Sequence, residues 1–364
     1  MQTVENLKVS REQYFVEMQE TWNLTQKFML LKIEKSLETN VALKALLFSN
    51  PVVKKRLTHK KPMLRPFLVR LSYEACRGNN WKSLIPVFAC AEFLNISTYI
   101  TNAVFDEKAE RTKNKDINQY IILSMIFRDL ANESLSDLKA SLSQEELQII
   151  HNKINEINRL IYFGQYLDLY ELKYDKINKE KLNEFKKLYL ERCEKFTGVF
   201  FANLSYIGAL LADGTFAQKK ALERFGFSLG TGDQIVNDLG DFVIESAKAT
   251  DFEKSYKDLY SDLKQGKTTY PVLLSLELGK NLVSSNLNNK NLSIANMRGI
   301  ANFFVSSDIF SKTKKLSISK FHECKKELKK LPESRARNML SIMASLLRSN
   351  KYFAFFRELK KNQL

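Results

Sequence analysis

The sequence predicts an all-α fold, a single large helical domain over residues 1–364 with ten or more helices. Only 12 glycines and 6 prolines are spread over the 364 residues, too few turn-forming residues for an all-β or repeat architecture. Hydrophobic residues make up 44% of the chain, which is enough for a large buried core. Because no shift in composition marks a second domain, we expect a single domain.

Apolar periodicity and capping signals place the helices along the chain. A break is expected at Asn50-Pro51, a helix start at Ser143-Gln144-Glu145-Glu146 and a helix end at Asp213-Gly214. The segments expected to be helical or apolar cover residues 1–50 (one or two helices), 66–76, 82–105, 117–138, 141–172, 179–211, 216–246 and 284–364, the last with Asn- and Ser-rich joints.

The charge and the cysteines limit the partners and the compartment. Lysine and arginine number 57 against 41 acidic residues, a net charge of +16 that is typical of a chain binding anions. The lysines are scattered without a basic tail, so no nucleic-acid partner is expected. Four widely spaced cysteines predict free thiols in a reducing, cytoplasmic location. The absence of a signal pattern, and polar breaks in the longest apolar run, predict no membrane span.

The stretch Gly230 to Glu245, GTGDQIVNDLGDFVIE, carries the strongest chemical signal. On a helix, Asn237, Asp241 and Glu245 stand at i, i+4 and i+8, with Asp238 beside them. Such an oxygen-rich stripe suits a hard divalent cation, which would relieve the repulsion between stacked carboxylates.

A solvated helix face is the alternative explanation of this stripe. The apolar residues around it leave little room for a water-facing side. Lys257 and Lys267 follow downstream and bring positive charge, with Lys267 in a turn-like Gly266-Lys267-Thr268-Thr269 segment. Alternating acid and base around one centre favours a phosphate ligand bridged by metal over a plain surface.

Three separated stretches resemble the trans-polyprenyl diphosphate synthase superfamily, whose fold is shared with class I terpene synthases. They are LRPFLVRLSYEA (64–75), AEFLNISTYITNAVFDEKAER (91–111), and GTGDQIVNDLGDF followed by SDLKQGKTTYP (230–242 and 261–271). Weaker similarity lies in GQYLDL (164–169) and KFTGVFFANLSYIGALLADG (195–214). The resemblance implies the isoprenoid synthase fold, in which the helices surround a central cavity.

The resemblance also implies two metal-binding walls. The family's first motif, DDxxD, is NAxxD here, so Asn102 and Asp106 are the candidate ligands and Ala103 offers none. An Asp106 without a ligand role is the alternative. A neutral amide oxygen in place of a carboxylate should weaken metal binding on this wall.

The second wall is better preserved. Gln234, Asn237, Asp238 and Asp241 fall on the family's QxxDDxxD motif, and with Glu245 they also match most of the terpene-synthase motif NDxxSxxxE. The resemblance implies Mg²⁺ as the cofactor, three ions bound together with diphosphate. It gives the catalytic roles to Asp106, Asp241 and Lys267.

The positions that hold diphosphate differ between the two substrates of the family. For the allylic diphosphate, the resemblance implies Arg111, Lys257 and Lys267, while Phe196 replaces a usual lysine. Gln234 is a further candidate diphosphate contact. The isopentenyl diphosphate site is altered. Only its Arg65 is retained, and the other three positions are Pro62, Asn95 and Thr112.

These features lead to a class I terpene synthase as the predicted function. It would ionise an allylic prenyl diphosphate with loss of diphosphate. The resemblance allows a C15–C20 substrate, because Ser97 and Thr98, just upstream of the first motif, are small where bulky residues limit chain length in the family. A chain-elongating prenyltransferase and a catalytically weakened subunit are the alternatives. A homodimer is expected. Candidate aromatic residues for the cavity are Phe67, Phe93, Tyr99, Phe105, Phe163, Phe196, Phe200 and Phe201.

Overall fold

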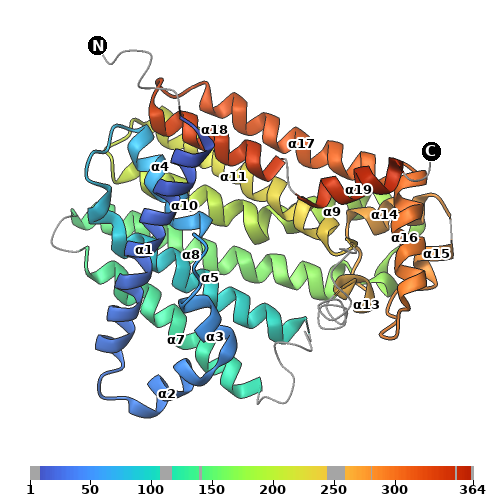
Figure 1. Cartoon of the computed structure of the whole chain (residues 1–364), viewed down its shortest axis with the longest axis horizontal. Coiled ribbons are helices and arrows are strands. Elements are labelled where there is room, and N and C mark those ends of the chain that lie inside the picture. The colour runs from blue at the N-terminus through green and yellow to red at the C-terminus, as the bar shows by residue number, and fades with distance from the viewer. Residues whose placement is uncertain are drawn as a thin grey trace. The chain divides into compact units, whose positions relative to one another are not determined.

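The structure, a computed structural model, describes residues 9–106, 117–138, 142–243, 259–279, 281–348 and 351–361. Within these ranges all regular secondary structure is helical, apart from an isolated β-bridge between Lys173 and Lys267 (Figure 1). The all-α prediction is confirmed. Backbone contacts divide the chain into unit 1 (Met1–Asn155, Asn203–Arg224 and Glu327–Met343) and unit 2 (Glu156–Ala202, Phe225–Lys326 and Ala344–Leu364). The single-domain organisation and the central cavity stay predictions.

Side-chain capping explains how two helices of unit 1 begin. Ser10 and Gln13 form a reciprocal capping box at the start of the first helix. Asn50 accepts backbone hydrogen bonds ahead of Pro51, which confirms the predicted break there. The helices that lie wholly in this unit are α1 (Arg11–Ser36), α2 (Val41–Ser49), α3 (Pro51–Leu57), α4 (Leu64–Ala75), the 3₁₀ turn η2 (Trp81–Leu84), α5 (Ile85–Phe105) and α7 (Ile117–Ser136).

Helix α5 lies in the core of unit 1, packed against α1, α4 and α7. Arg70 of α4 ties α1 to this core, since its guanidinium contacts Glu17 of α1 at 3.0 Å and Glu74 of its own helix at 2.9 Å. The segment Trp81–Phe105 is long and apolar enough to cross a membrane by length and composition alone. Because 67% of its apolar window is buried inside the protein, a core helix explains the same pattern.

The remaining helices belong to unit 2 or have residues in both units. Ser143 and Glu146 exchange hydrogen bonds before α8, which confirms the predicted start. Helices with residues in both units are α8 (Gln144–Tyr166), α10 (Val199–Leu210), α11 (Phe216–Gly240), α17 (Ile309–Leu328) and α18 (Arg335–Arg348). Unit 2 alone holds the π turn η3 (Leu167–Glu171), the 3₁₀ turns η4 (Tyr174–Lys176) and η5 (Lys179–Lys181), α9 (Leu182–Cys193), the π turn η6 (Glu194–Gly198), α13 (Ser261–Lys264), α14 (Tyr270–Glu277), α15 (Asn281–Ser284), α16 (Ile294–Ser306) and α19 (Lys351–Lys361).

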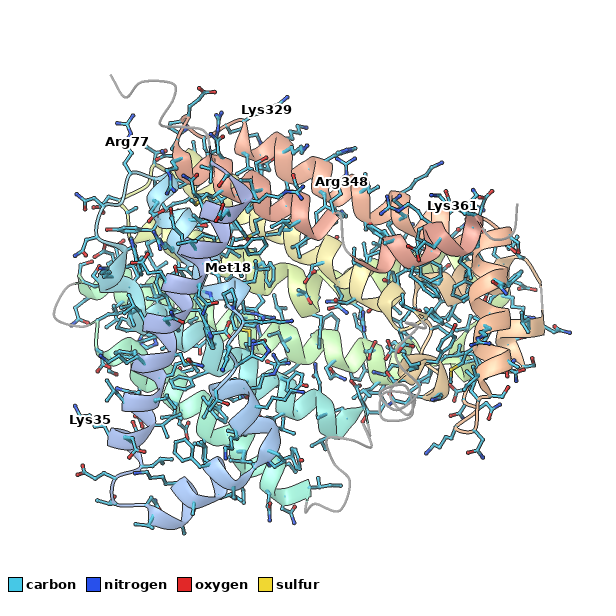
Figure 2. The ribbon with its side chains drawn as sticks, viewed as in Figure 1. Met18, Lys35, Arg77, Lys329, Arg348 and Lys361 are labelled. Atoms are coloured by element: carbon cyan, nitrogen blue, oxygen red, sulfur yellow. The ribbon has the colours of Figure 1, made fainter. Side chains whose placement is uncertain are left out.

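Polar and apolar residues separate as the composition suggests. Lys35, Arg77, Lys329 and Lys361 are exposed and project from the ribbon, whereas Met18 is buried (Figure 2). All four cysteines lie within the described residues and are free and buried, in agreement with the predicted free thiols.

Two glycines let the part of α11 that lies in unit 2 approach the π turn η6. A Cβ on Gly230 of α11 would lie 2.5 Å from the carbonyl oxygen of Thr197 and 3.1 Å from the Cα of Gly198. Both contacts are with backbone, which cannot rotate away. Glycine is therefore required for this approach, and it fixes the distance between α11 and the chain around η6.

We predict that Gly230→Ala lowers the free energy of unfolding by about 1–3 kcal/mol, because the added methyl must displace backbone. Gly299→Ala is the matched control. It lies in α16 with nothing within 4 Å of its added Cβ, so it should raise stability by about 0.5–1 kcal/mol through helix propensity. Urea unfolding of both variants checks this, and equal effects of the two would contradict the close approach at Gly230.

Candidate functional site

Helix α11 ends at Gly240, earlier than expected. The amides of Phe242 and Val243 bond to carbonyls three residues back, as in a tightening final turn. Asp241 therefore lies after the helix, and the prediction that it continues a helical stripe from Asn237 is wrong. The physical reason is a weak helix former at 240 followed by a carboxylate with better partners elsewhere. Glu245, the third member of the predicted stripe, lies outside the described residues.

Asp241 binds the start of α13. Its Oδ1 accepts from the amide of Ser261 at 2.9 Å and from the Ser261 hydroxyl at 3.1 Å, and its Oδ2 accepts from the amide of Asp262 at 3.2 Å. The carboxylate thus satisfies amides that a helix start leaves unpaired. Asn237, one turn before the end of α11, is exposed.

Asp238 faces the interior and is only 2% exposed. Arg192 of α9 donates from one terminal nitrogen to both of its oxygens, at 2.8 and 3.0 Å. The Tyr189 hydroxyl donates to Oδ2 at 2.7 Å, and the Gln234 amide donates to Oδ1 at 2.8 Å. The same Gln234 accepts from the Thr197 hydroxyl at 2.6 Å, so its side chain supports Asp238.

A second carboxylate, Asp168 of η3, completes a buried charge network. Its Oδ1 lies 2.8 Å from the other terminal nitrogen of Arg192, and its Oδ2 lies 2.6 Å from Nζ of Lys267. Lys267 is 3% exposed and also lies 3.8 Å from Asp262. Two carboxylates and two cations therefore alternate in the order Lys267, Asp168, Arg192, Asp238, which we call the buried charge network.

The network explains the titration of its members. Burial alone would raise the pKa of the Asp168 carboxyl, but the charges and hydrogen bonds of Arg192 and Lys267 outweigh it and lower the pKa to about 2. Burial alone would lower the pKa of Arg192, but the charges of Asp168 and Asp238 raise it well above its ordinary value. Asp168 and Arg192 are therefore both charged at neutral pH.

Backbone contacts fix Lys267 in place. Its amide bonds to the Asp262 carbonyl at 2.9 Å, and the next amide, of Thr268, bonds to the Leu172 carbonyl at 2.8 Å. Gly266 before it has φ +69°, a left-handed conformation that favours glycine. The turn predicted around Lys267 is confirmed, and it places the lysine against the chain that carries Asp168.

Two network residues escaped the sequence analysis. Asp168 lies in GQYLDL, a stretch noted only as a weak similarity. Arg192 precedes Phe196 by four residues, one helical turn, and its guanidinium lies 5.7 Å from the Phe196 ring centroid. The sequence signal that could have identified Arg192 is a basic residue one helical turn before Phe196, a position where the family has lysine.

The first wall belongs to unit 1. Asp106 caps the C-terminus of α5 and is buried, its amide bonded to the Asn102 carbonyl at 2.8 Å, and Ala103 is fully buried. Asn102 is half-buried. Ser97 is buried and its hydroxyl bonds to Ser124 of α7 at 2.9 Å, so this small residue belongs to a polar contact between α5 and α7.

Arg65 lies in the first turn of α4, and its positive charge affects the pKa of Glu92. Burial raises the pKa of the Glu92 carboxyl, and the positive charge of Arg65 opposes that rise without cancelling it. Asn95 donates to Glu92 at 3.0 Å. Arg111 and Lys257, the other predicted diphosphate contacts, lie outside the described residues.

The candidate aromatic residues differ in how far they are exposed to solvent. Phe67, Phe93, Phe200 and Phe201 are buried, while Phe105 and Phe163 are 43% and 39% exposed. Tyr99 stacks under Arg56, whose guanidinium carbon is 3.6 Å from the ring centroid. Burial alone does not assign these aromatic side chains to a cavity, so their role there stays a prediction.

The described second-wall residues offer a donor set that suits a cation whose coordination shell is completed by water and a bound phosphate ligand. Within the described part of the chain, no three His, Cys, Asp or Glu side chains converge as a metal site. Asn237 and Asp241 offer one amide and one carboxylate. Mg²⁺ typically takes one or two carboxylates and fills its remaining positions with water and substrate phosphates, so this small donor set suits Mg²⁺ bound together with diphosphate.

The pKa of Asp168 predicts a pH dependence of stability. Its pKa falls from the ordinary 3.8 to about 2 on folding, so the ionised carboxylate stabilises the folded chain above about pH 4. That contribution, about 2 kcal/mol, is lost as the pH falls from about 4 to 2. Urea unfolding across this range should show a smaller pH dependence for Asp168→Asn than for the unmodified chain.

Asp175→Asn, at an exposed position, serves as the control and should follow the unmodified chain. Equal pH dependence in Asp168→Asn and the unmodified chain would contradict an ionised Asp168 in the network.

Comparisons with known proteins show which sequences and structures this chain resembles. The polyprenyl synthetase family model matches residues 52–302. A geranylgeranyl diphosphate synthase of Methanosarcina mazei is 27% identical over 225 residues, covering 60% of this chain and 64% of that protein. An octaprenyl diphosphate synthase of Escherichia coli is 25% identical over 219 residues, 59% of this chain and 62% of that protein. The match thus spans less than two thirds of these relatives.

A solved structure shows the same fold over most of the chain. The polyprenyl synthase of Caulobacter crescentus, complexed with calcium and isoprenyl diphosphate, superposes with a TM-score of 0.73 at 20% identity. The superposition covers 94% of this chain and 99% of that one. With the family model matching well over half of its length, the chain belongs to the polyprenyl synthetase family.

Proposed function

We propose that this chain is a chain-elongating prenyl diphosphate synthase, which joins an allylic prenyl diphosphate to isopentenyl diphosphate with release of diphosphate. The family match over residues 52–302 is the observation that carries the proposal. The names of the relatives favour this alternative over the predicted terpene synthase.

Unpaired donors around the buried charge network support an anionic ligand. Nε of Arg192, Nε2 of Gln165 and Oγ1 of Thr269 are buried and have no hydrogen-bond partner among the described residues. Gln165 stands three residues before Asp168, and Thr269 two residues after Lys267. Because a buried donor without a partner is costly, a diphosphate with many acceptor oxygens is a fitting occupant.

The chain's own residues would divide the work as follows. On the first wall Asn102 and Asp106 would be the Mg²⁺ ligands, and on the second wall Asn237, Asp241 and Glu245 would be. Mg²⁺ when bound neutralises the charge of the diphosphate. A set of cationic and amide side chains would grip the phosphates directly, and its members are Arg65, Arg111, Lys257, Lys267 and Gln234. Lys267 would keep its position through Asp168, 2.6 Å away.

One incubation tests the proposed function. Purified protein is supplied with Mg²⁺ and labelled farnesyl diphosphate, with and without isopentenyl diphosphate. A longer prenyl diphosphate that appears only when both substrates are present is the expected product. A hydrocarbon formed without isopentenyl diphosphate would instead establish the terpene synthase.

If no product forms in either incubation, the chain would instead be a subunit that needs an active partner. The specific observation behind that second candidate is the first wall, where Asn102 and Ala103 offer no carboxylate. Adding a purified active synthase of the family and measuring whether its product length or rate changes would then test the subunit.

A matched pair on the second wall tests the metal roles. Asp241→Asn should lower turnover roughly 100-fold or more. It removes the carboxylate of Asp241, which the proposal assigns to Mg²⁺, and with it several kcal/mol of charge stabilisation. Asn237→Asp should retain turnover, since a carboxylate serves a hard cation at least as well as an amide. Steady-state rates against Mg²⁺ concentration decide it. Full activity in Asp241→Asn would remove this residue from the metal wall.

We also propose that the chain forms a homodimer through α7. Three apolar side chains spaced four residues apart, Ile117, Ile121 and Met125, are 53%, 48% and 60% exposed on this helix. Such a stripe on one helix face is typical of a surface that packs against another chain.

The α7 stripe predicts the effect of a charge on assembly. Met125→Glu should halve the mass measured by light scattering after size exclusion, because a carboxylate would be buried without a partner. Val41→Glu, at a valine of α2 that is 73% exposed, should leave the mass unchanged. A dimer that survives Met125→Glu would place the interface elsewhere.

A further inference from the structure

Arg192 is the central cation of the buried charge network. Its side chain is enclosed, and the residue as a whole is 5% exposed. One terminal nitrogen contacts both oxygens of Asp238, at 2.8 and 3.0 Å, and the other contacts Asp168 at 2.8 Å. A guanidinium keeps its charge at any physiological pH, so this cation is a permanent part of the site.

The hydrogen bonds to Asp238 fill its acceptor capacity. A carboxylate offers about four lone-pair directions. Oδ1 receives hydrogen bonds from Gln234 at 2.8 Å and Arg192 at 3.0 Å, and Oδ2 receives them from Tyr189 at 2.7 Å and Arg192 at 2.8 Å. A metal ligand needs a free lone pair directed at the ion, and Asp238 has none left in this arrangement.

Neighbouring packing holds Arg192 in this position. Tyr189 stands on the same helix, α9, three residues before it, and Gln234 is held by Thr197 of η6 at 2.6 Å. The close approach of Gly230 to Thr197 and Gly198 fixes η6 against α11. Withdrawing Arg192 would leave two buried carboxylates with Lys267 as their remaining cation in the network, a costly state.

We propose that Arg192 takes, at Asp238, the place that the sequence predicts for a divalent cation. The second wall then binds metal through Asn237 and Asp241, and Asp238 is a structural counter-ion of Arg192. This inference goes beyond the proposed function and does not depend on it, because cation binding and coordination are measured without turnover.

The first test compares two isosteric substitutions in Mn²⁺ titrations followed by electron paramagnetic resonance, with inorganic pyrophosphate present. Asp238→Asn should leave the affinity for Mn²⁺ within about 2-fold of the unmodified chain, and Asp241→Asn should weaken it by about 10-fold or more. Weakening of similar size in both variants would make Asp238 a ligand and overturn the proposal.

The second test removes the arginine. Arg192→Gln leaves Asp168 and Asp238 with Lys267 alone, a net charge of −1 that favours a new divalent cation. This variant should gain Mn²⁺ binding that is absent from Arg192→Lys and is lost again in Arg192→Gln with Asp238→Asn. A folded Arg192→Gln variant that binds Mn²⁺ like the unmodified chain would contradict the proposal.

Anomalous diffraction from crystals of the unmodified chain with Mn²⁺ and pyrophosphate gives a readout that does not require any variant to fold. Arg192 should remain on Asp238, with no Mn²⁺ peak within coordinating distance of that carboxylate. A Mn²⁺ peak on Asp238 with Arg192 displaced would overturn the proposal.

Discussion

The pairing of Arg192 with two buried carboxylates is the interaction on which the rest of the site depends. It joins α9 to η3 through Asp168 and to α11 through Asp238, with contacts of 2.8 Å on each side. Through Asp168 it also sets the environment of Lys267. Four segments that are distant in the sequence are thereby held by alternating charges, each of which would be costly to bury alone.

This arrangement explains how a site with fewer carboxylates than its family pattern keeps its shape. The first wall has lost two acidic positions, at Asn102 and Ala103, and the second has Asn237 for aspartate. The buried charge network is neutral by itself, so its geometry does not require a bound metal. On the proposal made above, metal binding would fall to the exposed Asn237 and to Asp241, which also anchors α13.

Much of the fold followed from the sequence, because capping residues and apolar periodicity are local signals. The Asn50-Pro51 break and the Ser143 capping box were both found where expected. The end of α11 at Gly240 was not, because Asp241 bonds to residues some twenty positions away. The partnership of Arg192 with Asp238 spans a separation of 46 residues, and no periodicity within one helix reports such a contact.

The central claim, that Arg192 and Asp238 form the bond that organises the site, is tested most directly by a double-mutant cycle. Free energies of unfolding are measured for the unmodified chain, Arg192→Met, Asp238→Asn and the double variant. The account predicts a coupling energy of at least about 1.5 kcal/mol, because each single change leaves a buried charge short of a partner. Additive effects, with coupling near zero, would contradict it.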